Sequence, residues 1–138
     1  MTRLKALVLS LVFAGMVAQP QAQGSGASDI EAVIRDQIAA FETGDLSAAF
    51  EHASPMIRQM FRTPDIFGQM VREGYPMVWR PEALSFGALE SQGPRTLQRV
   101  VIRDAQGRVH LLEYEMIRLG DGWKINGVRF LEPPQVGA

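Results

Sequence analysis

The spacing of apolar residues changes once along this chain, near Leu84, and that change constrains the fold more than any other feature. Before it, apolar residues recur every three or four positions, which is typical of amphipathic helices. After it, they alternate with polar residues at a period of two, which is typical of strands. The chain has 138 residues, close to the usual size of one domain. We therefore expect a single α+β domain over residues 28–138.

The N-terminal half is predicted to contain several short helices. Ser28, followed three residues later by Glu31, forms a capping-box pattern, and the apolar residues after it share one helical face. Further helices are expected after Asp45, Ser54 and Thr63, because each is a good capping residue that precedes an apolar run. A proline follows both Ser54 and Thr63, and proline suits the first helical position.

Four alternating runs follow the helices, and they are predicted to form a meander. The runs are 84–90, 96–103, 109–118 and 123–131. Short turn-forming sequences that contain glycine separate them, and links that short join only antiparallel neighbours. Short N-terminal helices packed on a curved four-stranded antiparallel meander are therefore the expected architecture.

Both faces of the predicted strands carry apolar residues. In the third strand, Leu112, Tyr114 and Met116 point to one face, while Leu111 and Ile117 point to the other. One layer of short helices does not easily cover both faces. We therefore expect either strong curvature of the sheet around the first helix or a second copy of the chain against the outer face. A homodimer is the preferred expectation.

The first 22 residues predict export. Two basic residues precede an apolar run over 6–17, and Ala22 is the preferred cleavage site, with Ala18 as the alternative. As a helix the run spans only about 18 Å, against about 30 Å of hydrocarbon, so a removable signal peptide is expected rather than a stable membrane anchor. Residues 23–27 are expected to be a flexible lead-in. The predicted location is the periplasm or the exterior.

Composition excludes several classes of function. The chain contains no cysteine, so it has no disulfide, thiol nucleophile or zinc–thiolate site. The formal net charge is -1, and without the leader 12 basic and 15 acidic residues give -3. This argues against nucleic-acid binding, which depends on neutralising phosphates. His52 and His110 lie far apart without metal-ligand spacing, so we expect neither a metal nor a cofactor.

Several motifs resemble one known family and, more loosely, one fold. These motifs are Ala53-Ser54-Pro55, Phe61, Thr63-Pro64, Phe67, Tyr75-Pro76-Met77-Val78-Trp79-Arg80-Pro81 and Gly122-Trp123-Lys124-Ile125-Asn126-Gly127-Val128. Over residues 28–138 the chain is similar to a family of small exported bacterial proteins known as domain of unknown function 4864, a likeness that implies no reaction or ligand. The order of helices and strands also resembles nuclear-transport-factor-2-like folds, which implies a cone-like architecture. Because that architecture serves enzymes, ligand binders and interaction modules alike, function must be argued from a site.

The segment 74–81 has the most distinctive local chemistry. Pro76 and Pro81 bias the residues before them toward extended backbone, so the segment is expected to present its side chains as one wall of a pocket. Aromatic and methionine side chains suit an apolar ligand, and Arg80 suits a carboxylate or phosphate. The alternative is a rigid connector in which Trp79 closes the end of the core. The expected ligand-binding residues are Phe61, Phe67, Tyr75, Met77, Trp79, Arg80, Tyr114 and Met116.

Four polar residues of the third strand are candidates for chemistry. His110 and Tyr114 share one face with apolar neighbours, where a histidine base and a tyrosine donor could transfer a proton. Their structural alternative is an exposed or hydrogen-bonded histidine and a core tyrosine. Glu113 and Glu115 lie on the opposite face and suit acid–base chemistry if one is desolvated, but cross-strand ion pairs are preferred. The candidate arginine partners are Arg99, Arg103 and Arg129.

Three functions remain open from the sequence. The preferred one is non-catalytic binding of a small amphipathic ligand or an envelope partner protein in a pocket between the helices and the sheet. The second is a cofactor-free proton-transfer enzyme of isomerase or dehydratase type that uses His110 and Tyr114. The third is a structural homodimer held together by the outer face of its sheet.

Overall fold

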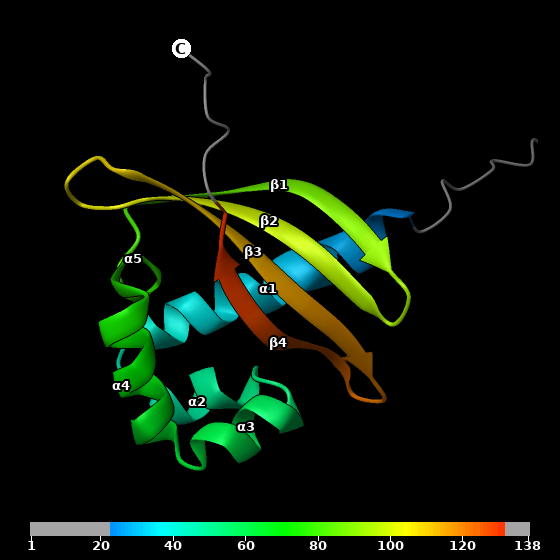
Figure 1. The fold of residues 1–138 in the computed structure, drawn as a ribbon, viewed down its shortest axis with the longest axis horizontal. Coiled ribbons are helices and arrows are strands. Elements are labelled where there is room, and N and C mark those ends of the chain that lie inside the picture. Colours follow the sequence, from blue (N-terminus) through cyan, green and yellow to red (C-terminus); the bar gives the residue numbers. More distant parts are fainter. Residues whose placement is uncertain (1–22, 132–138) are drawn as a thin grey trace, which may run out of the picture.

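The structure, a computed structural model, describes residues 23–131, which form a helical layer and a sheet (Figure 1). Within this part of the chain the helices are α1 (Gln23–Glu42), α2 (Leu46–Glu51), α3 (Pro55–Phe61), α4 (Pro64–Gly74) and α5 (Pro76–Trp79). The strands are β1 (Ala83–Gln92), β2 (Arg95–Arg103), β3 (Val109–Leu119) and β4 (Gly122–Phe130). The α+β prediction is confirmed. The leader expected over residues 1–22 lies outside the described residues.

α1 begins earlier than the sequence predicts. Residues 23–27, expected as a flexible lead-in, belong to this helix, so Ser28 and Glu31 lie inside it rather than at its start. Both residue types are tolerated inside a helix, and burial of the apolar stripe that follows stabilises the helix independently of a cap. That stripe is confirmed, since Ile30, Ile34 and Phe41 are almost completely buried. No helix in the described part of the chain has the length and apolar character needed to cross a membrane.

The next three helices begin where the sequence predicts. Asp45, Ser54 and Thr63 each accept a hydrogen bond from the backbone N–H three residues later, at 3.1, 3.3 and 3.2 Å. Proline occupies the first position of both α3 and α4. These caps satisfy backbone donors that a helix start leaves unpaired, and they allow three short helices to follow one another closely.

The proline-flanked segment differs from the extended wall that the sequence predicts. Tyr75 and Arg80 have φ angles of -136° and -144°, but their ψ angles of 57° and 76° are smaller than those of extended backbone, and residues 76–79 between them form the single turn α5. The reason is that each proline restricts the residue before it, whereas its own fixed φ suits the first turn of a helix. As a result Met77 and Val78 are buried.

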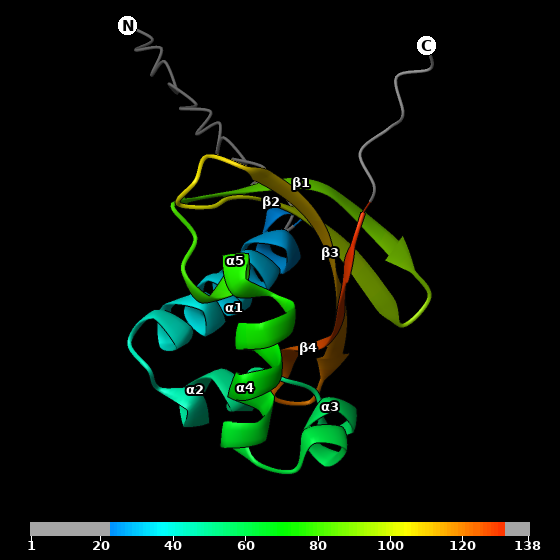
Figure 2. The ribbon, with the colours of Figure 1, turned by 60° about the vertical axis from the view of Figure 1, so that its left-hand side comes forward.

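The sheet is an antiparallel meander in the order β1-β2-β3-β4, which confirms the predicted topology. Two register shifts interrupt the pairing, one between Phe86 and Leu89 in β1 and one opposite Glu115 and Met116, where Asn126 of β4 is left out of the register. Such bulges bend and twist the strands that carry them. Figures 1 and 2 show the sheet curving over α1, with α2, α3 and α4 grouped at one end of α1 and toward the β4 side of the sheet.

The segment between α2 and α3 lies along the edge of β4. Ala53 forms a parallel bridge with Ile125, supported by hydrogen bonds from Ser54 N–H to the Ile125 oxygen (2.8 Å) and from Ile125 N–H to the His52 oxygen (2.9 Å). The Ser54 hydroxyl donates to Asn126 Oδ1 at 2.7 Å. These bonds fix the start of α3 against the sheet.

The outer face of the sheet carries ion pairs among half-buried apolar residues. Glu113 is only 6% exposed there and accepts a hydrogen bond from Arg129 Nε at 2.7 Å. Glu115 accepts hydrogen bonds from Arg95 (2.8 Å) and Asn126 (2.6 Å). The expectation of cross-strand ion pairs is thus confirmed for Glu113, whose partner is Arg129. The partner of Glu115 is Arg95, which was not among the expected arginines, and Arg99 and Arg103 pair with neither glutamate. A second copy of the chain against this face stays a prediction.

Candidate functional site

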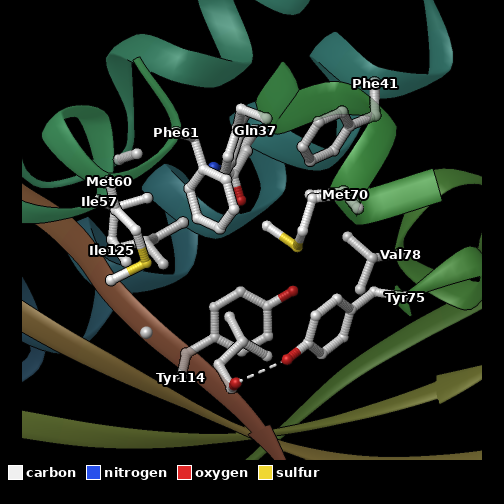
Figure 3. Close-up of a pocket in the computed structure, with 15 residues that line it drawn as sticks. Gln37, Phe41, Ile57, Met60, Phe61, Met70, Tyr75, Val78, Tyr114 and Ile125 are labelled. Carbon is white, nitrogen blue, oxygen red and sulfur yellow. Dashed lines mark hydrogen bonds between the residues drawn. The ribbon is translucent and has the colours of Figure 1, made fainter. Parts of the chain in front are cut away.

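A cavity of about 200 Å³ lies between the helices and the sheet (Figure 3). Side chains of α1, α3, α4 and the α4–α5 region form one side, and β3 and β4 form the other. The aromatic and methionine residues that line it are Phe41, Phe61, Phe67, Tyr75, Tyr114, Met60 and Met70. None of its lining residues carries a formal charge. The space is therefore suited to a mainly apolar molecule.

The structure brings some of the predicted ligand-binding residues to this cavity and places the others elsewhere. Phe61, Phe67, Tyr75 and Tyr114 line it, whereas Met77, Trp79, Arg80 and Met116 do not. Met77 and Met116 are buried in the core instead.

Trp79 packs against its neighbours rather than facing the cavity. Its ring lies 5.2 Å from that of Phe41, and the Arg72 guanidinium lies 4.3 Å above it. Arg80 is exposed, away from the cavity. The connector interpretation of this segment thus describes Trp79 better than the pocket-wall interpretation, because the turn of α5 directs Trp79 toward α1 and α4.

Several lining residues were not among the predicted binding residues. Ile57, Met60 and Met70 come from the apolar faces of α3 and α4, and Val128 comes from β4. Gln37 is the most informative omission, because it is a buried polar residue within the apolar stripe of α1. A polar residue at a core-facing helical position is a signal that could have identified it from the sequence.

An aromatic cluster forms the wall on the helical side. The ring of Phe67 on α4 lies 5.9 Å from Phe41, 5.4 Å from Phe50 and 5.9 Å from Phe61, all in tilted arrangements. Pairs at these distances stabilise one another beyond the area they bury. The cluster ties α1, α2, α3 and α4 together around the cavity.

α3 is the least buried part of this wall. None of its residues is buried, and Met60 lines the cavity although its side chain is 61% exposed. α3 therefore forms the rim of the cavity. Arg62, directly after α3, has φ = 69°, a conformation that non-glycine residues rarely adopt.

Three polar side chains line the cavity, and two of them are fixed by hydrogen bonds to the backbone. The Tyr75 hydroxyl donates to the Val128 oxygen at 3.0 Å, as Figure 3 shows, and Gln37 Nε2 donates to the Ala49 oxygen at 3.1 Å. The third is Tyr114, whose hydroxyl is fully buried without a hydrogen-bond partner among the described residues. Burial, and to a smaller extent the neighbouring Tyr75, raise the pKa of Tyr114 well above its usual value. Its phenol therefore stays protonated and can donate.

His110 does not join Tyr114 in a proton-transfer pair. Its Nε2 lies 2.8 Å from Asp104 Oδ2, while Asp104 Oδ1 accepts hydrogen bonds from the backbone N–H groups of Gln106 and Arg108, both at 2.9 Å. The hydrogen bond with His110 is the main cause that lowers the pKa of Asp104. Tyr114 follows His110 by four positions along the strand, about 13 Å at 3.3 Å per residue. His110 thus stabilises the β2–β3 turn and does not line the cavity.

The remaining histidine, His52, also lies away from the cavity lining. Burial lowers its pKa, more than the nearby carboxylate of Asp36 raises it. Across residues 23–131, His, Asp and Glu side chains form no group of three or more that could hold a metal ion.

The profile of one protein family, domain of unknown function DUF4864, matches residues 23–138. The chain belongs to DUF4864. This confirms the family resemblance seen in the sequence motifs. No curated protein matches this DUF4864 chain, so no activity is transferred from a relative.

Solved structures similar to this DUF4864 domain include two proteins of low sequence identity. One is the solution structure of RPA3114, a SEC-C motif containing protein from Rhodopseudomonas palustris, with a TM-score of 0.57 and 17% identity over 78% of this chain and 82% of that chain. The other is an NTF-2 like protein of unknown function from Burkholderia xenovorans LB400, with a TM-score of 0.48 and 13% identity over 83% of this chain and 91% of that chain. The first likeness shows a shared fold alone, and the second is too distant to support an argument.

Proposed function

We propose that this DUF4864 domain binds a small amphipathic molecule in the cavity between its helices and its sheet. The observation that carries the proposal is an uncharged cavity of about 200 Å³, lined by aromatic, methionine and aliphatic side chains, whose wall contains one unpaired hydroxyl. An engineered apolar cavity of ~150 Å³ is large enough to bind benzene. This cavity therefore has room for a molecule with one ring or a short chain.

The cavity favours a small molecule over an inserted segment of a partner protein and over a proton-transfer reaction. An inserted peptide segment needs a longer groove than a cavity of this volume supplies. Catalysis by proton transfer needs an acid and a base within reach of the same atom, and His110 lies outside the lining that contains Tyr114. If residues 1–22 direct export, as their sequence predicts, the ligand is a molecule of the periplasm or the exterior.

Methionine methyl groups give a direct test of binding. We expect toluene, added to the protein labelled with ¹³C at its methionine methyl groups, to shift the signals of Met60 and Met70 saturably, because both line the cavity. Met56 shares α3 with Met60 but does not line the cavity, and Met116 is buried elsewhere in the core, so both are internal controls. Equal shifts at all four methionines, or none at Met60 and Met70, would contradict the proposal.

A matched pair of substitutions tests the location independently. Val128→Phe enlarges a half-buried side chain of the lining, whereas Val109→Phe makes the same change at an exposed position of β3 outside it. We expect the first to abolish the toluene-induced shifts and the second to preserve them. Amide spectra of both variants show whether each remains folded. Toluene binding that survives Val128→Phe in a folded protein would place the site elsewhere.

A further inference from the structure

The Tyr114 hydroxyl is a buried hydrogen-bonding group of the cavity wall that has no partner among the described residues. The residue is 0% exposed, and no partner for its oxygen is present among the described residues. Figure 3 shows this hydroxyl pointing into the space beside Met70 and Tyr75. Because the oxygen is fully buried, an occupant of the cavity reaches this donor after a small shift of the flexible Met70 side chain.

The neighbours of Tyr114 in the sheet have their polar groups engaged elsewhere. On one side, the backbone oxygen of its β4 partner Val128 accepts the hydroxyl of Tyr75. On the other, the amide nitrogen of its β2 partner Gln98 donates to the backbone oxygens of Gly87 (3.1 Å) and Arg99 (2.9 Å). None of these contacts satisfies Tyr114.

A buried hydroxyl without a partner destabilises a protein, so phenylalanine would fill this position at lower cost. A ligand that supplies the missing acceptor removes that cost when it binds. The hydrogen bond between the ligand and Tyr114 also orients the ligand. Its polar atom then lies against β3, while its apolar part extends toward the aromatic cluster and α3.

The lining also determines the charge of the ligand. It contains no lysine, arginine, histidine or carboxylate side chain. An ionised group transferred into such a cavity would lose its hydration without an opposite charge to compensate. A carboxylate, phosphate or ammonium group is therefore disfavoured.

We propose, on the basis of the binding function above, that the ligand is an uncharged, mainly apolar molecule whose one carbonyl or hydroxyl oxygen accepts a hydrogen bond from Tyr114. The neutral phenol of Tyr114 is the donor, and the apolar body packs against Phe61, Met60 and Met70. This assigns the chemical class of the ligand and the residue that recognises its polar end.

Three probes of nearly the same shape test the class. Acetophenone carries a carbonyl oxygen, α-methylstyrene replaces that oxygen by a methylene group, and benzoate replaces the methyl group by a charged oxygen. Their affinities are measured from the methyl shifts of Met60 and Met70 in the unaltered protein and in Tyr114→Phe. Within each protein the ratio of the acetophenone and α-methylstyrene affinities cancels their shared apolar contribution.

We expect Tyr114→Phe to lower that ratio about tenfold, the equivalent of one buried hydrogen bond. Tyr75→Phe is the matched control: its hydroxyl is already bonded to Val128, so this variant should change both affinities by the same factor. Benzoate should bind at least tenfold more weakly than acetophenone.

The outcomes separate this inference from the binding function on which it rests. An unchanged ratio in a folded Tyr114→Phe protein, or benzoate affinity equal to that of acetophenone, overturns the inference while leaving ligand binding intact. If neither acetophenone nor α-methylstyrene shifts the signals of Met60 and Met70, the proposed function and the inference fail together.

Discussion

Replacing Tyr114 by phenylalanine should stabilise the ligand-free protein, although most substitutions of fully buried residues destabilise. The ring keeps its place in the core, and only the hydroxyl is removed. That hydroxyl has no hydrogen-bond partner among the described residues, so its removal breaks no bond and relieves the cost of its burial. The prediction therefore depends directly on the hydroxyl being unpaired.

Two opposing terms set the size of the effect. Relief of a buried unpaired hydroxyl contributes about 1–3 kcal/mol. Removal of the hydroxyl enlarges the cavity by less than ~30 Å³, the volume that one molecule occupies in liquid water. At ~24 cal/mol per Å³ of cavity, this costs at most about 0.7 kcal/mol. The free energy of unfolding should rise by about 0.5–2 kcal/mol.

Tyr75→Phe is the matched control in the same cavity wall. Its hydroxyl donates to the Val128 oxygen at 3.0 Å, so this substitution breaks a bond and should lower the free energy of unfolding by about 1 kcal/mol. The stacking of its ring on Phe130, with centroids 5.1 Å apart, is kept in the variant. The same chemical change at the two tyrosines is thus expected to have opposite signs.

Urea denaturation measures both effects. With a slope of 1–3 kcal/mol per molar urea, a change of ~1 kcal/mol moves the midpoint by about 0.5 M, upward for Tyr114→Phe and downward for Tyr75→Phe. If Tyr114→Phe lowers the free energy of unfolding by 1 kcal/mol or more, the hydroxyl already has a partner in the ligand-free protein. That result would refute the proposal that the Tyr114 hydroxyl is free to donate a hydrogen bond to the ligand.

Other features of the structure give further predictions. Ser54→Ala removes the cap of α3 and the partner of Asn126 Oδ1, so urea denaturation should show a loss of about 1–3 kcal/mol. Arg129→Ala leaves the buried carboxylate of Glu113 without this partner and should cost about 1–2 kcal/mol by the same measurement, a value reduced because Arg129 is exposed. Because burial lowers the pKa of His52 below its ordinary 6.5, the unfolded chain binds more protons than the folded one below that pH. Stability, measured by thermal unfolding, should therefore fall as the pH drops from 6.5 toward the lowered value, and His52→Gln should reduce this fall. Light scattering at micromolar concentration should show a homodimer, and a monomer would exclude one.

Local patterns in the sequence were sufficient to predict most of the fold. The capping residues Asp45, Ser54 and Thr63 and the change to alternating spacing determine where the helices and strands begin. Short turns leave adjacent strands little choice but to pair antiparallel, so the meander followed from loop length alone. The start of α1 was missed because a capping box at Ser28 is a local preference, and other residues can precede it within the same helix.

The cavity was harder to predict, because it depends on how the elements pack. The sequence identified Phe61, Phe67, Tyr75 and Tyr114, which are large apolar or amphipathic residues on core-facing positions. It could not show that residues 76–79 form a turn, and that turn is what directs Met77 and Trp79 away from the cavity. The positions of the prolines are compatible with both a helical turn and an extended segment, so the local sequence does not distinguish the two.

The way α3 is attached to the sheet explains why a cavity persists beside a well-packed core. α3 buries none of its residues, so packing alone does not determine how close it lies to the sheet. Its start is held instead by the Ser54 hydroxyl on Asn126, whose amide nitrogen in turn donates to Glu115 on the outer face. A wall positioned by hydrogen bonds at one end does not have to collapse onto the strands opposite it. Ser54→Ala should therefore weaken toluene binding as well as stability, whereas a change that destabilises the outer face without touching this chain of bonds, such as Arg129→Ala, should affect stability alone.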